Sequence, residues 1–178
     1  MGLVRLDKVA AEIPITVDRR PYLLSPDRPA EGEPRELREG ETQFELNPAW
    51  QERARAAGVE MRRPQISPRT NLAHEVTAYA RERGLDGEFH HAVARAYWER
   101  GVNLGEPAAL REIGESVGLN WAEIEPLLDS GHYRQQVLDD SQAAKDRGVF
   151  GTPTYSINGG APDFGDKSVE DLRQMLQG

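Results

Sequence analysis

The sequence contains no cysteine among its 178 residues. Because a thiolate is the group that attacks a disulfide, this chain has no nucleophile of its own for thiol–disulfide exchange. The same absence excludes disulfide crosslinks and cysteine-based zinc sites, and only four histidines remain as imidazole ligands. We therefore expect neither a catalytic cysteine nor a metal centre.

Long apolar runs and clustered positive charge are also absent. No apolar stretch approaches the roughly 18 residues of a membrane-spanning helix, and the first residues lack the apolar core of a secretory signal. The formal net charge of −8 argues against a nucleic-acid surface, which needs gathered Lys and Arg side chains. We expect a cytoplasmic protein that binds neither membranes nor nucleic acids.

The residues that are present are typical of a helix-rich globular protein, with 38% apolar and 29% charged residues. A short helix is predicted over 48–57, with Asn47 as its cap and Pro48 at its first position. Apolar residues then recur at helical spacing in successive segments between residues 69 and 132, separated by glycine turns. Asn120 and Glu123 form a capping-box pair at the start of one of these helices. The series indicates a small helical subdomain.

The first 40 residues predict a helix, a strand and a loop. Apolar residues at three- and four-residue steps indicate an amphipathic helix over 2–13, with no capping side chain before it. Two interpretations stay open: a frayed terminal helix, or a helix that the start of the sequence divides. Pro14 ends the helix, and alternating residues predict a strand over 14–20. Residues 25–40 are acidic and interrupted by proline, so they predict a surface loop.

The C-terminal part predicts a helix, a hairpin and a second helix. A polar helix over 133–147 ends at Gly148, and β-branched and aromatic residues predict a strand over 154–157. Asn-Gly-Gly at 158–160 is the strongest hairpin signal in the chain. Ser168, with Asp171 three residues later, caps a final helix.

The segment from Gly148 to Gly159 reads GVFGTPTYSING. It resembles the proline loop of DsbA-like thioredoxin-fold proteins, a family of thiol–disulfide oxidoreductases. In that family the loop proline is cis, and the residue before it leaves its backbone N–H and C=O groups unpaired beside the active site. The resemblance implies that Thr152 and Pro153 bind substrate, and that the partner is an extended peptide segment or a small thiol.

Further segments resemble the DsbA-like group that includes the 2-hydroxychromene-2-carboxylate isomerases. Residues 21–27 and 31–32 are similar to the segment after the second core strand, and motifs at 69–74, 89–98 and 104–105 are similar to the inserted helical domain. The resemblance implies an α/β thioredoxin-like fold with an inserted all-helical subdomain. The expected thioredoxin-like domain comprises residues 1–43 and 133–178, and the expected insertion comprises residues 44–132.

The chain departs from the family at its front. Relatives carry a strand and then Cys-Pro-x-Cys, or a serine version of it, just before a helix that resembles residues 2–8. The resemblance therefore implies that the first, central strand and the redox pair are missing here and that the sequence is N-terminally truncated. The strands near 15–19 and 154–157 would then face a gap, where each buried unpaired backbone group costs about 1 to 3 kcal/mol. Either a longer gene or a neighbouring chain, as in a homodimer, would supply the strand.

The histidines and carboxylates offer no alternative catalytic centre. His90 and His91 are expected on a solvated helix surface, His132 at an exposed helix start, and His74 as a half-buried, hydrogen-bonded side chain rather than a catalytic base. The carboxylates are too dispersed for an acid–base pair, and no Ser-His-Asp arrangement is indicated. We assign no catalytic residue and no metal ligand.

Three functions stay open. The first is a DsbA-family relative of protein-disulfide oxidoreductases that is inactive in dithiol chemistry as this chain stands, so that its being an enzyme is undecided. The second is a relative of glutathione-dependent isomerases or kappa-class transferases, with glutathione as cofactor; the lack of cysteine favours it. The third is a non-catalytic domain that binds peptides or thiols at Thr152 and Pro153.

Overall fold

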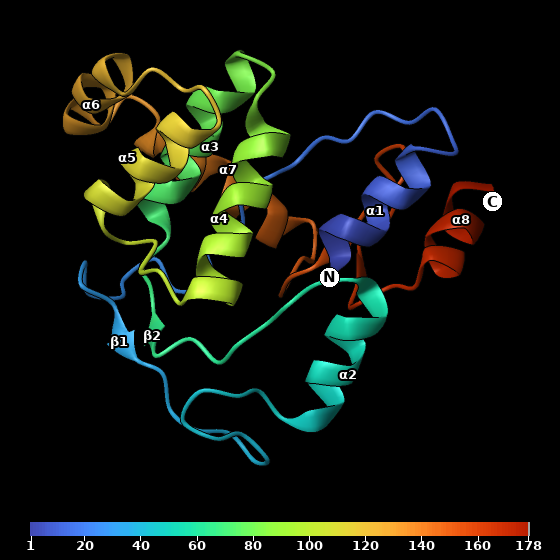
Figure 1. Cartoon of the computed structure of the whole chain (residues 1–178). Coiled ribbons are helices and arrows are strands. Elements are labelled where there is room, and N and C mark those ends of the chain that lie inside the picture. Colours follow the sequence, from blue (N-terminus) through green and yellow to red (C-terminus); the bar gives the residue numbers. More distant parts are fainter. Residues whose placement is uncertain (178) are drawn as a thin grey trace.

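The computed structural model describes residues 1–177, and helices dominate it (Figure 1). The helices are α1 (Gly2–Ala10), α2 (Pro48–Ala57), α3 (Asn71–Glu82), α4 (Asp86–Arg100), α5 (Pro107–Ser116), α6 (Trp121–Ser130), α7 (Arg134–Asp146) and α8 (Val169–Gln177). The strands are β1 (Glu33–Pro34), β2 (Ile66–Ser67), β3 (Thr154–Tyr155) and β4 (Asp163–Phe164). They form two separate antiparallel pairs, β1 with β2 and β3 with β4.

Two of the predicted helix starts are confirmed in detail. The Asn47 side chain accepts a hydrogen bond from the Trp50 amide at 2.9 Å at the start of α2. At the start of α8, the Ser168 amide donates to Asp171 Oδ2 at 2.7 Å and the Asp171 amide donates to Ser168 Oγ at 3.0 Å. These side chains satisfy amides that have no partner inside their own helix.

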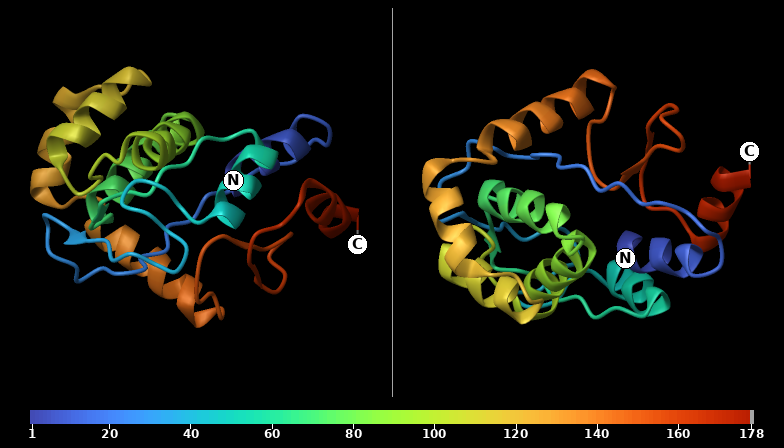
Figure 2. Two further views of the ribbon diagram at one scale, coloured as in Figure 1. Left: turned by 60° about the horizontal axis from the view of Figure 1, so that its bottom comes forward. Right: turned by 90° about the horizontal axis from the view of Figure 1, so that it is seen from above.

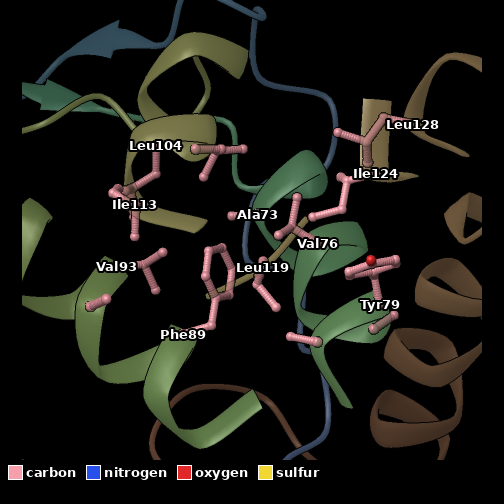
Figure 3. Packing of buried hydrophobic residues seen from close by; sticks show 14 of the residues in the cluster. Ala73, Val76, Tyr79, Phe89, Val93, Leu104, Ile113, Leu119, Ile124 and Leu128 are labelled. Atoms are coloured by element: carbon pink, nitrogen blue, oxygen red, sulfur yellow. The ribbon is translucent and has the colours of Figure 1, made fainter. Parts of the chain in front are cut away.

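The main apolar core lies among the helices of the middle of the chain. Phe89 and Tyr79 are fully buried in it, and the cluster draws its members from residues 73–133. Figure 3 shows the Phe89 ring pointing into this cluster, with Val93 on its own helix and Val76 on α3 nearby. The cluster lies mostly within the predicted helical subdomain, and the division into residues 1–43 with 133–178 and 44–132 stays a prediction.

The two ends of the chain come together away from that core. Helices α1 and α8 contact each other, and the views of Figures 1 and 2 place both beyond the cluster of α3 to α6. In the same views α2 lies beside the N-terminal end of α1. Helix α1 therefore has two neighbours that are distant from it in sequence, α8 and, beside its first turn, α2.

The predicted strand over 14–20 is wrong as a strand. The segment has no regular secondary structure, and residues 14–22 make no backbone–backbone hydrogen bond within the described chain. Its burial nevertheless alternates: Ile13, Ile15, Val17 and Arg19 are half-buried, whereas the residues between them are exposed. The period-two pattern correctly predicts the alternating burial. A strand also needs a hydrogen-bonded neighbour for its ladder, and this segment has none within residues 1–177.

The predicted hairpin is confirmed, with a strand shorter than the expected 154–157. Thr154 pairs with Phe164 and Tyr155 with Asp163. Asn158 and Gly159 have φ values of 48° and 76°, the left-handed region that Asn-Gly turns adopt. The Arg147 guanidinium donates to the Gly159 and Gly160 carbonyls at 3.1 and 2.9 Å, which fastens the turn to the end of α7.

The loop after residue 25 is closed by a buried ionic cluster around Glu41. The Arg35 guanidinium donates to both oxygens of Glu41 at 2.7 Å, and Arg63 Nε lies 3.3 Å from Glu41 Oε2. Only 2% of the Glu41 side chain is exposed. The hydrogen bonds from Arg35 outweigh burial and lower the pKa of Glu41 to about 2.

No helix within residues 1–177 is long and apolar enough to cross a bilayer.

Candidate functional site

The loop carrying Thr152 and Pro153 lies at the surface between α7 and β3. Both residues are exposed, and the peptide bond between them is cis. The Pro153 carbonyl accepts a hydrogen bond from the Gly165 amide at 2.9 Å, and Thr154 Oγ1 donates to the Gly151 carbonyl at 2.7 Å. Within the described residues, neither backbone group of Thr152 has a backbone partner. Hydrogen-bonded neighbours therefore flank an exposed residue whose amide and carbonyl have no backbone partner.

The first turn of α1 packs directly against this loop. A β-carbon added to Gly2 would lie 3.7 Å from both Cβ and Cγ of Pro153 and 2.6 Å from the Tyr155 hydroxyl oxygen. The amides of a first helical turn have no partner inside the helix and carry the positive end of its dipole. The surface beside Pro153 thus has a partial positive charge before any side chain is counted.

Tyr155 is a site residue that sequence reasoning missed. It follows Thr154 on β3, so its side chain projects from the opposite face of the hairpin, toward α1. Its hydroxyl oxygen is buried and has no hydrogen-bond partner in the described chain. Burial, reinforced by the nearby Asp166 carboxylate, raises the pKa of Tyr155, which keeps its hydroxyl protonated and able to donate.

An ionic bridge joins three segments beside the same turn. Asp166 Oδ2 lies 2.7 Å from Arg5 Nη1 on α1 and 2.6 Å from Arg53 Nη2 on α2. Burial by itself would raise the pKa of Asp166, but the two guanidinium groups outweigh it and lower that pKa. Because Asp166 follows Gly165, the bridge is adjacent to the residue whose amide binds the Pro153 carbonyl. The local sequence gives no signal for a contact between residues so far apart.

The histidines do not gather into a site. His132 is exposed, as predicted. His91 is not simply solvated as expected, because its Nε2 lies 2.8 Å from Asp7 Oδ2 and so joins α4 to α1. His90 is half-buried instead of solvated, and burial, together with Arg19, lowers its pKa. His74 is half-buried as predicted but makes no side-chain hydrogen bond within residues 1–177, and burial lowers its pKa to about 4. His90 and His91 point in different directions because they are adjacent on a helix, and of the two His91 pairs with Asp7 on α1.

The part of the chain that the structure describes has no group of three His, Cys, Asp or Glu side chains arranged to hold a metal ion. The chemical resources around Pro153 are therefore backbone hydrogen-bonding groups and, in the neighbouring ionic bridge, the half-exposed guanidinium group of Arg53. They can bind and orient a polar or anionic ligand.

Comparison with known protein families identifies the family of this chain. The family model of the DSBA-like thioredoxin domain matches residues 1–177. The chain belongs to this family. The resemblance to the DsbA-like family and the α/β thioredoxin-like fold with a large helical part, both expected from the sequence, are thereby confirmed.

Individual proteins agree with the family assignment. An uncharacterised protein of Bacillus subtilis, YwbO, is 26% identical over 148 residues, which cover 80% of this chain and 72% of YwbO. Among solved structures, a probable DsbA oxidoreductase from Streptomyces coelicolor aligns with a TM-score of 0.85 at 23% identity, covering 99% of this chain and 82% of that one. A putative protein disulfide isomerase from Nitrosomonas europaea aligns with a TM-score of 0.60 at 19% identity, covering 78% and 76%. At these identities the two structures establish the shared fold.

Proposed function

We propose that this DSBA-like domain binds an extended peptide or a small thiol along Thr152 and Pro153, without carrying out dithiol chemistry itself. The observation that carries the proposal is the exposed Thr152, whose backbone N–H and C=O have no backbone partner in the described chain. An extended ligand backbone could add to such groups as a strand adds to a sheet edge.

Two further observations support a ligand at this position. The first turn of α1 packs on Pro153 and directs unpaired amides and the positive end of its dipole toward the loop. Beneath this surface the Tyr155 hydroxyl is buried, and its raised pKa keeps it protonated, so it adds no negative charge beside the turn. Thiolates and carboxylates are the groups that such surroundings stabilise.

The absence of cysteine limits the chemistry. Reduction of a substrate disulfide requires that one thiolate form a mixed disulfide and a second thiol release it, and this chain supplies neither sulfur. The chain should therefore reduce insulin no faster than buffer with dithiothreitol alone. Turnover clearly above that level would contradict the proposal.

Binding itself is tested by titrating the ¹⁵N-labelled chain with reduced glutathione and, separately, with an extended hexapeptide. The amide resonances of Thr152, Thr154 and Gly165 should shift in a saturable way, while those of the α5–α6 region stay unchanged. Saturable shifts confined to other regions, or no shifts up to about 10 mM ligand, would refute the proposal. A dissociation constant of about 10 mM corresponds to a binding free energy of about −2.7 kcal/mol.

Location and assembly are part of the same proposal. The cytoplasmic location expected from the sequence is checked by fractionating cells that express the tagged protein. A homodimer in which one chain lends a strand to its partner is checked by sedimentation equilibrium.

A further inference from the structure

The turn of the β3–β4 hairpin exposes an asparagine next to a glycine. Asn158 and Gly159 are both exposed, and a β-carbon built on Gly159 meets no atom within 4 Å. The side-chain hydrogen bonds of this turn come from Arg147 and Ser156, and none within residues 1–177 involves the Asn158 side chain. The Gly159 amide has no backbone acceptor in the same part of the chain. A free side-chain amide therefore lies beside a free, unobstructed backbone N–H.

These two groups can react with each other. When base removes the proton of the Gly159 N–H, the nitrogen attacks Cγ of the Asn158 side chain, and an N–C bond forms. The C–N bond of the side-chain amide breaks, and its nitrogen takes up a proton and leaves as ammonia. The resulting succinimide ring is opened by water at either of its carbonyls, which gives aspartate or isoaspartate. Overall a water molecule enters and an ammonia molecule leaves, and nothing is oxidised or reduced.

The four other asparagines of the sequence lack this combination. Asn47 is followed by Pro48, which has no N–H to attack Cγ. Asn71, Asn103 and Asn120 are followed by leucine or tryptophan, and each donates a side-chain hydrogen bond to a fixed acceptor. Within residues 1–177, an unbonded asparagine side chain followed by glycine occurs only in the hairpin turn.

Arg147 holds this turn in its present conformation. Its Nη2 atom donates to the carbonyls of Gly159 and Gly160 at 3.1 and 2.9 Å, and it lies 3.1 Å from Ser156 Oγ. Ring closure requires rotation about the backbone and side-chain bonds of Asn158 until Cγ meets the Gly159 nitrogen. Contacts that fix the turn therefore slow the reaction, because it proceeds only while the turn is locally open.

We propose that Asn158 is a site of spontaneous deamidation and that Arg147 sets its rate by holding the turn closed. The isoaspartate product has an extra carbon in the main chain and a new negative charge, both in the connection between β3 and β4. Gly165, at the end of this hairpin, donates its amide to the Pro153 carbonyl, so the modification changes an element that supports the candidate site. The inference does not depend on the proposed function.

The test incubates the full chain, Arg147→Met and Asn158→Gln at pH 8 and 37 °C and follows tryptic peptides by mass spectrometry. The peptide 148–167, or 146–167 in Arg147→Met, contains Asn158 and no other asparagine or glutamine. The peptide 112–134 contains Asn120 in the same way. Asn120 is the matched control, since it is exposed but its side-chain oxygen and nitrogen are both hydrogen-bonded. Isoaspartyl methyltransferase labels the isoaspartate, and far-ultraviolet circular dichroism establishes that each variant is folded.

Because Asn120 must first break two hydrogen bonds, the Asn158 peptide of the wild type should convert at least about tenfold faster than the Asn120 peptide. Arg147→Met should raise the rate at Asn158 about three- to tenfold, since hydrogen bonds from a charged group no longer hold the turn, and should leave the rate at Asn120 unchanged. Asn158→Gln should abolish methyltransferase labelling of its peptide.

Equal conversion at Asn158 and Asn120, including no conversion at either, would overturn the modification site whatever the variants do. An unchanged or lower rate at Asn158 in Arg147→Met would overturn the control by Arg147. A rate that rises equally at both asparagines in this variant would do the same, because it would show general loosening of the fold.

Discussion

The Tyr155 hydroxyl oxygen lies too close to Gly2 for a side chain at that position: a β-carbon on Gly2 would be 2.6 Å from it. The absence of a side chain at position 2 therefore allows the first turn of α1 to contact β3 and the proline loop. The contact leaves the Tyr155 hydroxyl buried without a partner. This relationship sets the geometry of the candidate site.

Gly2→Ala should destabilise the domain. Alanine is the better helix former by about 1 kcal/mol, but a methyl group 2.6 Å from an oxygen must displace α1 or β3, which costs about 1 to 3 kcal/mol in packed structures. We expect a net loss in the free energy of unfolding, measured by urea denaturation. Tyr155→Phe removes the clashing, unsatisfied oxygen, so the double variant should recover most of that loss. A more stable single variant, or strict additivity in the double variant, would show that the two residues do not meet as described.

Glu41→Gln should be strongly destabilising. The substitution leaves the guanidinium groups of Arg35 and Arg63, whose side chains are 10% and 4% exposed, without a counter-charge. Breaking a buried pair in this way costs about 3 to 5 kcal/mol. The matched control is Glu115→Gln, which removes an exposed ion pair with Arg111 and should cost less than about 0.5 kcal/mol. Similar losses for both variants, measured by urea denaturation at pH 7, would contradict the structural role of the Glu41 cluster.

Stability should fall on mild acidification because of His74. Burial lowers its pKa from 6.5 to about 4, so the unfolded chain binds a proton more readily than the folded one. The contribution of the neutral, buried His74 side chain to the free energy of unfolding is complete above pH 6.5 and is lost as the pH falls toward 4. At pH 5 this loss amounts to about 2 kcal/mol.

The pH effect is isolated by comparing His74→Gln with His132→Gln, which changes an exposed histidine. The free energy of unfolding of each is measured at pH 7 and pH 5. His74→Gln should lose less stability between the two pH values than the wild type does, and His132→Gln should lose as much as the wild type. Identical losses in all three proteins would assign the acid sensitivity to other groups, such as the half-buried His90.

How much the sequence could predict depends on the range of each interaction. The caps at Asn47 and at Ser168 with Asp171 are contacts over three residues, and both are present as predicted. The alternation over 14–20 predicts its burial correctly but not its pairing, because a ladder is a property of two segments. For the site, the local motif drew attention to Thr152 and Pro153, whose binding role stays a prediction. Arg53 and Asp166 escaped notice because α2 and the end of β4 meet only in the folded chain.

Asp166→Asn tests whether the guanidinium groups of the ionic bridge attract an anionic ligand. In the wild type, Asp166 pairs with Arg5 and Arg53. Under the proposed function it would compete with a ligand carboxylate for these two guanidinium groups. Asparagine keeps the shape and a hydrogen-bond acceptor but removes the negative charge, which leaves two uncompensated guanidinium groups beside the first turn of α1. Glutathione should therefore bind several-fold more tightly to the variant, with a steeper decline in affinity as salt rises from 50 to 300 mM, while affinity for glutathione diethyl ester, which has no carboxylates, stays nearly constant. A residue that serves only to hold α2 in place would have the reverse effect, because its loss would weaken binding of both ligands alike. Titrations of the variant with both ligands at the two salt concentrations separate these outcomes, and a uniform loss would exclude competition between Asp166 and the ligand.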